Sequence, residues 1–177
     1  MVVEQLLGYV LLLVGFVFFT NGMTLLGKTG GKEVGVLNLG VALLIVKAAW
    51  MLHEQGVTSA AALVSVFALI YLLVYAVFVH GHDAKGLGWF CLFATITFVW
   101  YALKVFPAGM SPEGVGMFGV FCLAWALLTL LCFFAFAQGK NLGTSIGYLF
   151  IIEAFLTLLI PGMMLLSGTW KPLSGGA

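Results

Sequence analysis

The sequence predicts an all-α integral membrane protein whose six transmembrane helices form three two-helix hairpin repeats. Of its 177 residues, 63% are hydrophobic and 7% are charged, and the mean hydropathy is +1.21. A soluble domain of this size would need far more polar surface than such a composition supplies. The apolar residues also gather in six runs, each long enough to cross a bilayer, which takes about 20 residues. Short connections between the runs complete the pattern.

The six runs are the predicted membrane spans, and they cover Leu6–Leu26, Val34–Leu52, Ala60–His80, Leu87–Phe106, Gly114–Ala137 and Thr144–Leu166. The connections between them are rich in Gly, Lys, Asp, Pro and Ser and are too short to hold a soluble domain. We therefore expect one membrane domain over residues 1–170 and a short tail over residues 171–177. The first residues lack the basic segment of a cleavable signal peptide, so we expect the first run to be a span.

The first, third and fifth connections share a sequence pattern. They read GKTGGK, GHDAKG and QGKNLG, and their centres lie about 55 residues apart. We interpret each as the turn of a helical hairpin, which gives three tandem repeats of the same orientation. The alternative interpretation is that Gly and Lys are common in the cytoplasmic turns of any membrane protein.

These three connections also indicate the orientation of the chain. They contain Lys28, Lys32, Lys85 and Lys140, whereas the connections on the opposite side contain no lysine. The positive-inside rule therefore predicts that the three connections are cytoplasmic and that both termini lie outside.

The first two spans contain signals for close helix packing. Gly8, Gly15 and Gly22 recur every seven residues, so they lie along one side of the first span, where a neighbouring helix can approach closely. Asn21 lies near the end of this span, and Asn38 is a polar residue within the second span.

Aromatic residues characterise the third and fourth spans. Tyr71 and Tyr75 are four residues apart and share one face of the third span. They predict either an aromatic wall that offers hydroxyl groups to a small polar solute or ordinary core packing. Trp89 and Tyr101 lie near the two ends of the fourth span, where we expect them to anchor the helix at the membrane interfaces.

The fifth and sixth spans contain the most unusual residues. Cys122 and Thr129 flank Trp125 on one face of the fifth span. The sixth span contains Glu153 close to its middle and Pro161 further along, where we expect a kink or the end of the regular helix. A carboxylate at membrane depth is costly unless it is paired, so Glu153 is either a functional group or a structural hydrogen-bonding group.

The sequence contains no pattern typical of an enzyme or a cofactor site. It shows no metal-ligating cluster, no nucleophile–base pair and no phosphate-binding loop. His80 and His82 adjoin Asp83 but lack further ligands, so we expect solvated histidines there. The absence of arginine argues against a nucleic-acid partner.

The cysteines give no sign of a disulfide or a metal site either, because they form no CxxC pair and all lie in apolar runs, at Cys91, Cys122 and Cys132. One carboxylate is too few for a typical proton relay, and an ion channel needs rings of charges or carbonyl groups. These features favour a narrow pathway for a small, neutral, polar molecule.

Four segments resemble the urea/amide channel family, which includes the acid-activated urea channel and the amide channels encoded beside amidases. They are GYVLLLVGFVFFTNG, YAVFVH, LAW and IIEAFLTLLIPGMMLL, and the resemblance covers nearly all of residues 6–170. It implies passive transport of urea or short-chain amides such as acetamide and formamide across the bacterial cytoplasmic membrane. It also implies one pore per protomer and a homo-hexamer around a lipid plug, and it leaves room for a cytoplasmic amidase or urease as a partner.

The resemblance assigns the pore to ten residues, which are Leu11, Val14, Phe18, Tyr71, Tyr75, Cys122, Trp125, Leu128, Thr129 and Glu153. The gated urea channel has more tryptophan on the fifth span, where this chain has Cys122 and Thr129. We therefore expect a wider or more polar constriction that admits a broader range of amides. The outer connections are short, and His53 is the one histidine in them. Because histidine is the side chain that titrates near neutral pH, we expect conductance that needs no acidification.

Two other classes of function remain open at this point. A secondary transporter would couple solute movement to protons through Glu153. A membrane scaffold or a small membrane enzyme would transport nothing, although the chain contains no soluble domain or reactive constellation that would favour it.

Overall fold

Helices make up nearly all of the chain that the structure describes. The computed structural model describes residues 3–106 and 116–172. Its helical elements are α1 (Val3–Leu25), α2 (Gly31–Glu54), α3 (Thr58–His80), α4 (Lys85–Trp100), η1 (Tyr101–Val105), α5 (Gly116–Phe136), α6 (Gly143–Glu153), η2 (Ala154–Leu159) and α7 (Ile160–Ser167), where η marks a π-helical segment. Within these residues, six helical stretches are long and apolar enough to cross a membrane. The predicted all-α fold with six membrane spans is confirmed.

The predicted ends of the spans lie within three residues of the observed helix ends wherever both are described. The helices mostly begin earlier than predicted, because the helical backbone continues beyond the apolar run into its polar ends. The predicted start of the fifth span, Gly114, lies outside the described residues, and so do residues 107–113 and 173–177.

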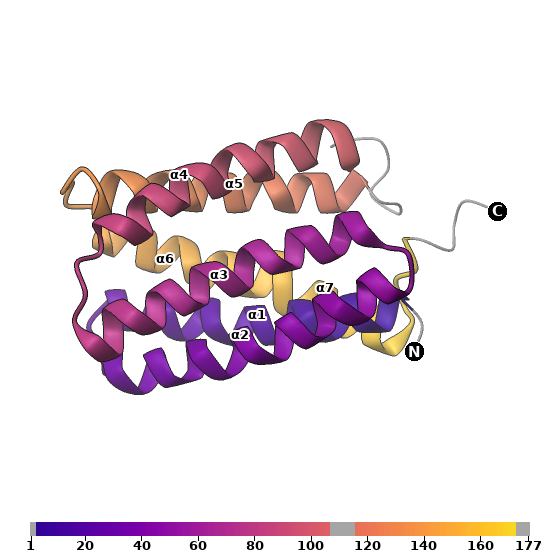
Figure 1. Cartoon of the computed structure of the whole chain (residues 1–177), viewed down its shortest axis with the longest axis horizontal. Helices are drawn as coiled ribbons and strands as arrows, with labels where there is room; N and C mark the ends of the chain where they lie inside the picture. Colours follow the sequence, from indigo (N-terminus) through magenta and orange to yellow (C-terminus); the bar gives the residue numbers. More distant parts are fainter. Residues whose placement is uncertain (1–2, 107–115, 173–177) are drawn as a thin grey trace.

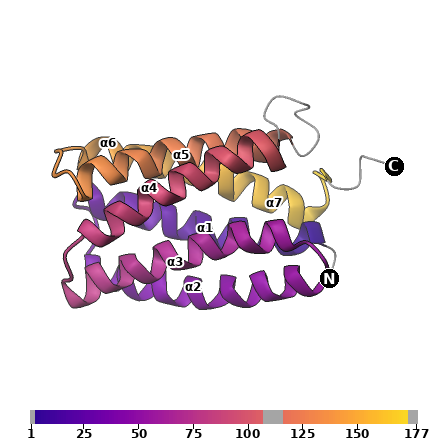
Figure 2. The ribbon, with the colours of Figure 1, turned by 45° about the horizontal axis from the view of Figure 1, so that its top comes forward.

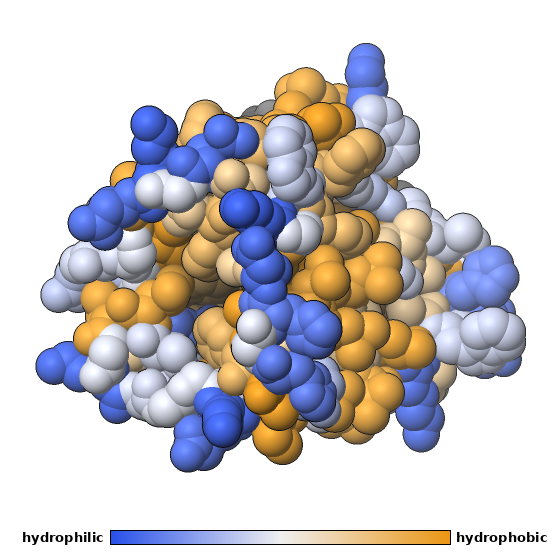
Figure 3. Space-filling model, turned by 60° about the vertical axis from the view of Figure 1, so that its left-hand side comes forward, coloured by the Kyte–Doolittle hydropathy of each residue, from blue (hydrophilic) through white to orange (hydrophobic). Residues whose placement is uncertain are grey.

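The two ends of the bundle differ in the connections and charged residues found there (Figures 1 and 2). The connections α1–α2, α3–α4 and α5–α6 all lie at one end, which we call the lysine end because Lys28, Lys32, Lys85 and Lys140 occur there. The α2–α3 connection, the start of α1 and the end of α7 lie at the other end, which we call the terminal end. Figure 3 views the lysine end and shows hydrophilic side chains gathered over it.

The most extensive helix packing occurs between α2 and α3, between α4 and α5, and between α1 and the α6–η2–α7 stretch. The helices joined by the glycine- and lysine-rich turns pack against one another less extensively. The six spans therefore form a closed ring in which extensively packed pairs of neighbouring helices alternate with less extensively packed pairs. The tandem repeat of three hairpins stays a prediction.

Glycines allow the close packing of α1 against the last span. A Cβ atom added at Gly22 would lie 2.7 Å from the carbonyl oxygen of Gly147, and one added at Gly8 would lie 2.9 Å from that of Gly162. Both distances are too short for a real side chain. The groove predicted from the seven-residue glycine spacing is therefore present, and it receives the backbone of the last span.

The last span is irregular just before Pro161, as predicted. The peptide N–H of Ile160 bonds to the carbonyl of Phe155, five residues back, in the π-helical segment η2. Pro161 has no N–H to donate to the carbonyl of Thr157, so the regular α-helical ladder is interrupted here. This irregular segment adjoins Glu153 and carries Thr157.

Tyr101 differs from the prediction. We expected it to anchor the fourth span at the membrane interface, but it is buried, and its hydroxyl donates a hydrogen bond to the carbonyl of Ser59 over 2.7 Å. The sequence places Tyr101 near a helix end, but the packing of the neighbouring helices decides which way its side chain faces. Trp89 and Trp100 are about half exposed on the same span and remain candidates for interface anchors.

Candidate functional site

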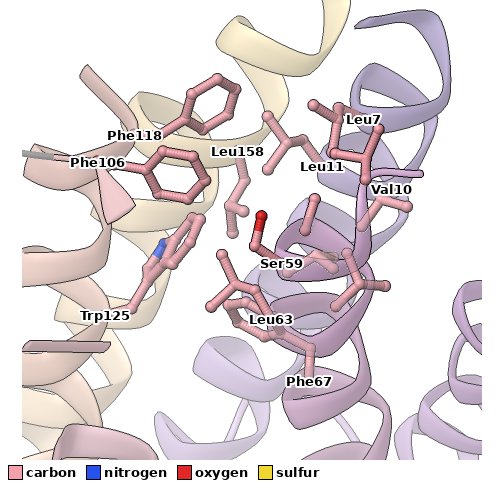
Figure 4. A pocket seen from close by; sticks show the side chains of 14 residues that line it. Leu7, Val10, Leu11, Ser59, Leu63, Phe67, Phe106, Phe118, Trp125 and Leu158 are labelled. Atoms are coloured by element: carbon pink, nitrogen blue, oxygen red, sulfur yellow. The ribbon is translucent and has the colours of Figure 1, made fainter. Parts of the chain in front are cut away.

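Two cavities lie inside the bundle, one towards each end. The first, of about 70 Å³, lies at the terminal end among the starts of α1, α3 and α5 (Figure 4). Its wall is almost wholly apolar and includes Leu7, Val10, Leu11, Val14, Ser59, Leu63, Phe106, Phe118 and Leu158. The second, of about 40 Å³, lies towards the lysine end, and its wall includes Phe18, Asn21, Tyr71, Val74, Leu87, Cys91, Leu128, Thr129, Cys132 and Phe150.

The size of these cavities limits what they hold. A single water molecule needs about 10–15 Å³ of cavity on the same measure. Each cavity therefore has room for a few water molecules or for one small solute with only a few non-hydrogen atoms.

An aromatic cluster stands between the two cavities. Phe67 and Trp125 line both of them. Their ring centroids lie 5.0 Å apart and their planes meet at 88°, which is an edge-to-face contact. Phe98 completes the cluster, with its ring centroid 5.2 Å from that of Phe67 and 5.9 Å from that of Trp125. We call these three residues the aromatic partition.

Hydrogen bonds fix the position of Trp125 in the partition. Its indole Nε1 donates to Oγ1 of Thr157 over 3.0 Å, and that hydroxyl donates to the backbone carbonyl of Glu153 over 2.8 Å. The hydroxyl of Thr129, one turn along α5, donates to the carbonyl of Trp125 over 2.8 Å. The irregular last span thereby holds one wall of the partition.

Three polar side chains lie in the wall of the second cavity, and they are Asn21, Tyr71 and Thr129. The amides of Asn21 and Asn38 exchange two hydrogen bonds, of 3.2 and 2.9 Å, and so join α1 to α2. The Oγ1 atoms of Thr95 and Thr129 lie 2.9 Å apart. The hydroxyl of Tyr71 is buried and has no hydrogen-bond partner among the described residues, so it can serve a solute.

The structure places seven of the ten predicted pore residues in a cavity wall. Leu11 and Val14 line the first cavity, and Trp125 lines both. The others line the second cavity, and they are Phe18, Tyr71, Leu128 and Thr129. Of the three residues predicted to share one face of the fifth span, Trp125 and Thr129 line a cavity and Cys122 lies outside both walls.

Three predicted pore residues line neither cavity. The Tyr75 hydroxyl lies 3.2 Å from Nε2 of His80, near the end of α3. Cys122 is fully buried in the helix packing. The carboxylate of Glu153 is buried, and neither of its oxygens has a hydrogen-bond partner within the described part of the chain.

Sequence reasoning missed Phe67, which lines both cavities. A signal for it exists, because Phe67 precedes Tyr71 by four residues and therefore lies on the same face of α3 one turn earlier. Phe98 offers no comparable signal, since it is one of several aromatic residues on α4 and only the packing brings it to the partition.

Comparisons with known proteins identify the family of the chain. Residues 6–169 match the sequence model of the AmiS/UreI family transporter. The chain is 34% identical over 166 residues to "Putative transporter protein AmiS2" of Rhodococcus erythropolis, with 90% of this chain and 79% of the relative covered. It is 32% identical over 170 residues to "Putative amidate substrates transporter protein" of Mycolicibacterium smegmatis, with 93% of this chain and 78% of the relative covered.

The fold is also similar to that of a solved membrane channel. The crystal structure of the urea channel from Helicobacter pylori superposes with a TM-score of 0.83 and 28% sequence identity, and 93% of this chain and 99% of that chain are covered. The closed state of the H. pylori urea channel, determined by cryo-electron microscopy, gives a TM-score of 0.79 and 26% identity, with 93% of this chain and 100% of that chain covered. Together with the six apolar helices, these matches identify a multi-pass membrane protein. The chain belongs to the AmiS/UreI family of transporters.

Proposed function

We propose that this protein is a passive membrane channel for urea and short-chain aliphatic amides such as acetamide and formamide. The observation that carries the proposal is the series of two small cavities separated by Phe67 and Trp125. This arrangement offers a path through the bundle that admits only a small molecule. The relatives support the solute class, because their names describe amide transport and a urea channel.

The chemistry of the walls favours a neutral solute over an ion. Both cavities are lined mainly by aliphatic and aromatic side chains. An ion that leaves water for such surroundings loses hydration worth of order 20 kcal/mol in the ideal limit. A neutral amide loses far less, and it regains hydrogen bonds from the few polar groups of the second cavity, such as Tyr71 and Thr129.

The predicted pore residues take different roles in this proposal. Leu11 and Val14 narrow the first cavity, while Tyr71 and Leu128 narrow the second, so that a planar amide passes more readily than a bulkier solute. Glu153 lies outside both cavity walls, so we assign it a place in the packing of the last span, beside Thr157, rather than a contact with the solute.

We also propose that conductance needs no acidification. Of the three histidines in the sequence, His53 is the one at the terminal end, in the last turn of α2, and its Nδ1 lies 3.3 Å from the Thr58 hydroxyl at the start of α3. It lies outside the walls of both cavities. A single histidine at this position gives a weak basis for a gate that closes the pathway near neutral pH.

The proposed cellular setting follows from the lysine distribution and from the family resemblance. The lysine end faces the cytoplasm, both termini lie outside, and the membrane is the bacterial cytoplasmic membrane. The protomers assemble as a homo-hexamer around lipid, and a cytoplasmic amidase or urease consumes the solute that enters.

A second candidate function is a proton-coupled transporter of a small neutral amide. Glu153 favours it, because its buried carboxylate has no hydrogen-bond partner among the described residues and is therefore a candidate proton carrier. A transporter of this kind accumulates solute against its gradient when a pH gradient is imposed, whereas a channel only equilibrates it.

The test is stopped-flow light scattering on proteoliposomes that contain the full chain. Entry of urea, acetamide and formamide is measured at neutral and at acid outer pH, with protein-free vesicles as the control. We expect fast entry of all three solutes at neutral pH that does not saturate. Entry of urea without either amide would contradict the broad solute range, and entry only in acid would contradict the absence of a gate.

A further inference from the structure

The second cavity contains two cysteines that the sequence pattern gave no reason to pair. Cys91 on α4 and Cys132 on α5 both line this cavity, and each is 3% exposed. The helices that carry them, α4 and α5, pack extensively against each other. Both cysteines are free. The packing of α4 against α5 therefore places two thiols in the wall of one small cavity.

The number of ligands decides which atom this pair suits. Structural Zn²⁺ takes four ligands, but the described residues contain no group of three or more His, Cys, Asp or Glu placed to hold a metal. The pair offers two sulfur ligands, which suit a soft, sulfur-seeking atom that bridges two thiols.

Access to the cavity limits the ligand further. The walls on both sides of the aromatic partition are mainly apolar, so an ion does not enter readily. A ligand that reaches the pair is therefore small and uncharged. Arsenous acid, As(OH)₃, meets both conditions, because it is uncharged at neutral pH and has as many non-hydrogen atoms as urea.

We propose that Cys91 and Cys132 form a dithiol site that captures the uncharged hydroxide of a trivalent metalloid, represented by As(OH)₃, and that the captured atom obstructs the second cavity. Access of the metalloid to the site rests on the proposed solute pathway. The obstruction follows from the cavity's volume of about 40 Å³, which leaves little room beside a bound arsenic atom.

The reaction is an exchange of oxygen for sulfur on arsenic. Two As–S bonds form and two As–O bonds break, and each departing hydroxide takes one thiol proton and leaves as water. The third hydroxyl remains on arsenic, whose oxidation state does not change. The buried hydroxyl of Tyr71 lines the same cavity and offers this third hydroxyl a hydrogen bond.

The first test measures arsenic bound to the purified full chain after incubation with arsenite and removal of the excess. We expect one arsenic per chain in the wild type, and loss of binding in both Cys91→Ser and Cys132→Ser. Cys122→Ser is the matched control, because Cys122 is fully buried and lines neither cavity. It should bind arsenic as the wild type does. Unchanged binding in either cavity variant, or no binding by the wild type, would overturn the site.

A second measurement needs no variant. Arsenic held by two thiols of the protein resists an excess of a monothiol such as 2-mercaptoethanol, because an As–S bond that breaks re-forms within the same molecule. It yields to a dithiol such as 2,3-dimercaptopropanol. We expect this pattern for the wild-type adduct. Release of arsenic by the monothiol alone would show attachment through a single thiol and would contradict the proposal.

Urea entry into proteoliposomes separates this proposal from the proposed function. We expect arsenite to reduce entry to the level of protein-free vesicles and the dithiol to restore it, with each variant compared with its own untreated flux. Arsenic bound through both cysteines in vesicles that never conduct urea would refute the channel and leave the site standing. Conducting vesicles that bind no arsenic would refute the site, and bound arsenic with unchanged urea entry would refute the obstruction.

Discussion

The ring of Phe67 meets the indole of Trp125 edge to face, with centroids 5.0 Å apart and planes at 88°, at the point where the two cavities of the bundle adjoin. Phe67 comes from α3 and Trp125 from α5, so the contact joins two spans that are not consecutive in the chain. In the proposed channel we expect this pair to limit the size of the solute that passes.

Replacing Phe67 by leucine should widen the passage between the cavities. We expect faster entry of propionamide and butyramide relative to urea, because a smaller aliphatic side chain removes one ring of the edge-to-face pair. The ratio of butyramide to urea entry by stopped-flow light scattering measures this change. Phe16→Leu is the control, since Phe16 is 47% exposed on the outside of α1. An unchanged ratio in Phe67→Leu would show that size selection lies elsewhere.

Replacing Thr157 by valine should loosen Trp125. The substitution removes the acceptor of the indole N–H at nearly constant volume, and an unpaired buried donor costs about 1–3 kcal/mol. We expect a lower thermal unfolding midpoint in detergent together with slower urea entry. Thr97→Val is the matched control, because the Thr97 hydroxyl bonds to the carbonyl of Phe93 in its own helix. Equal effects of the two substitutions would argue against a special role for the Trp125 bond.

The Asn21–Asn38 pair should behave as one energetic unit. Each single substitution by alanine leaves the other amide buried without its partner, whereas the double substitution removes both. We expect a coupling free energy within the range of about 0.5–3 kcal/mol that is typical of residues in one network. Unfolding of the four proteins of the cycle in denaturant measures it. Strictly additive effects would show that the two hydrogen bonds contribute nothing jointly.

Glycine substitutions test the close approach of α1 to the last span. Gly22→Ala should destabilise the protein, because the new Cβ would lie 2.7 Å from the carbonyl oxygen of Gly147. Gly40→Ala, in the interior of α2, has no atom within 4 Å of its new Cβ and should be stabilising by about 0.5–1 kcal/mol. Thermal unfolding in detergent compares the two. A stable Gly22→Ala protein would mean that the helices separate at little cost.

Glu153→Gln distinguishes the channel from the proton-coupled transporter. The amide keeps the size of the side chain but cannot carry a proton, so a channel should retain most of its urea and acetamide entry. A pH-sensitive dye trapped in the vesicles follows proton movement during solute entry. We expect no proton movement coupled to solute in the wild type or in the variant. Proton movement that the wild type shows and the variant lacks would establish the transporter instead.

The sequence by itself determined the number and extent of the spans, because crossing a bilayer imposes a length and a composition that can be counted along the chain. It also determined features of single helices. The spacing of Gly8, Gly15 and Gly22 indicated a groove on α1. The family resemblance assigned Leu11, Val14 and Phe18 to the pore, and these residues line the cavities.

Only the tertiary structure decided which faces meet. Helical spacing shows that Tyr71 and Tyr75 lie on related positions of α3, but the rotation of α3 in the bundle turns Tyr71 towards the second cavity and Tyr75 towards His80. The same packing directs Tyr101 inwards and brings Cys91 and Cys132, from different helices, into the wall of the same cavity. Periodicity fixes which residues share a face, whereas the rotation of each helix depends on the side chains of all its neighbours at once.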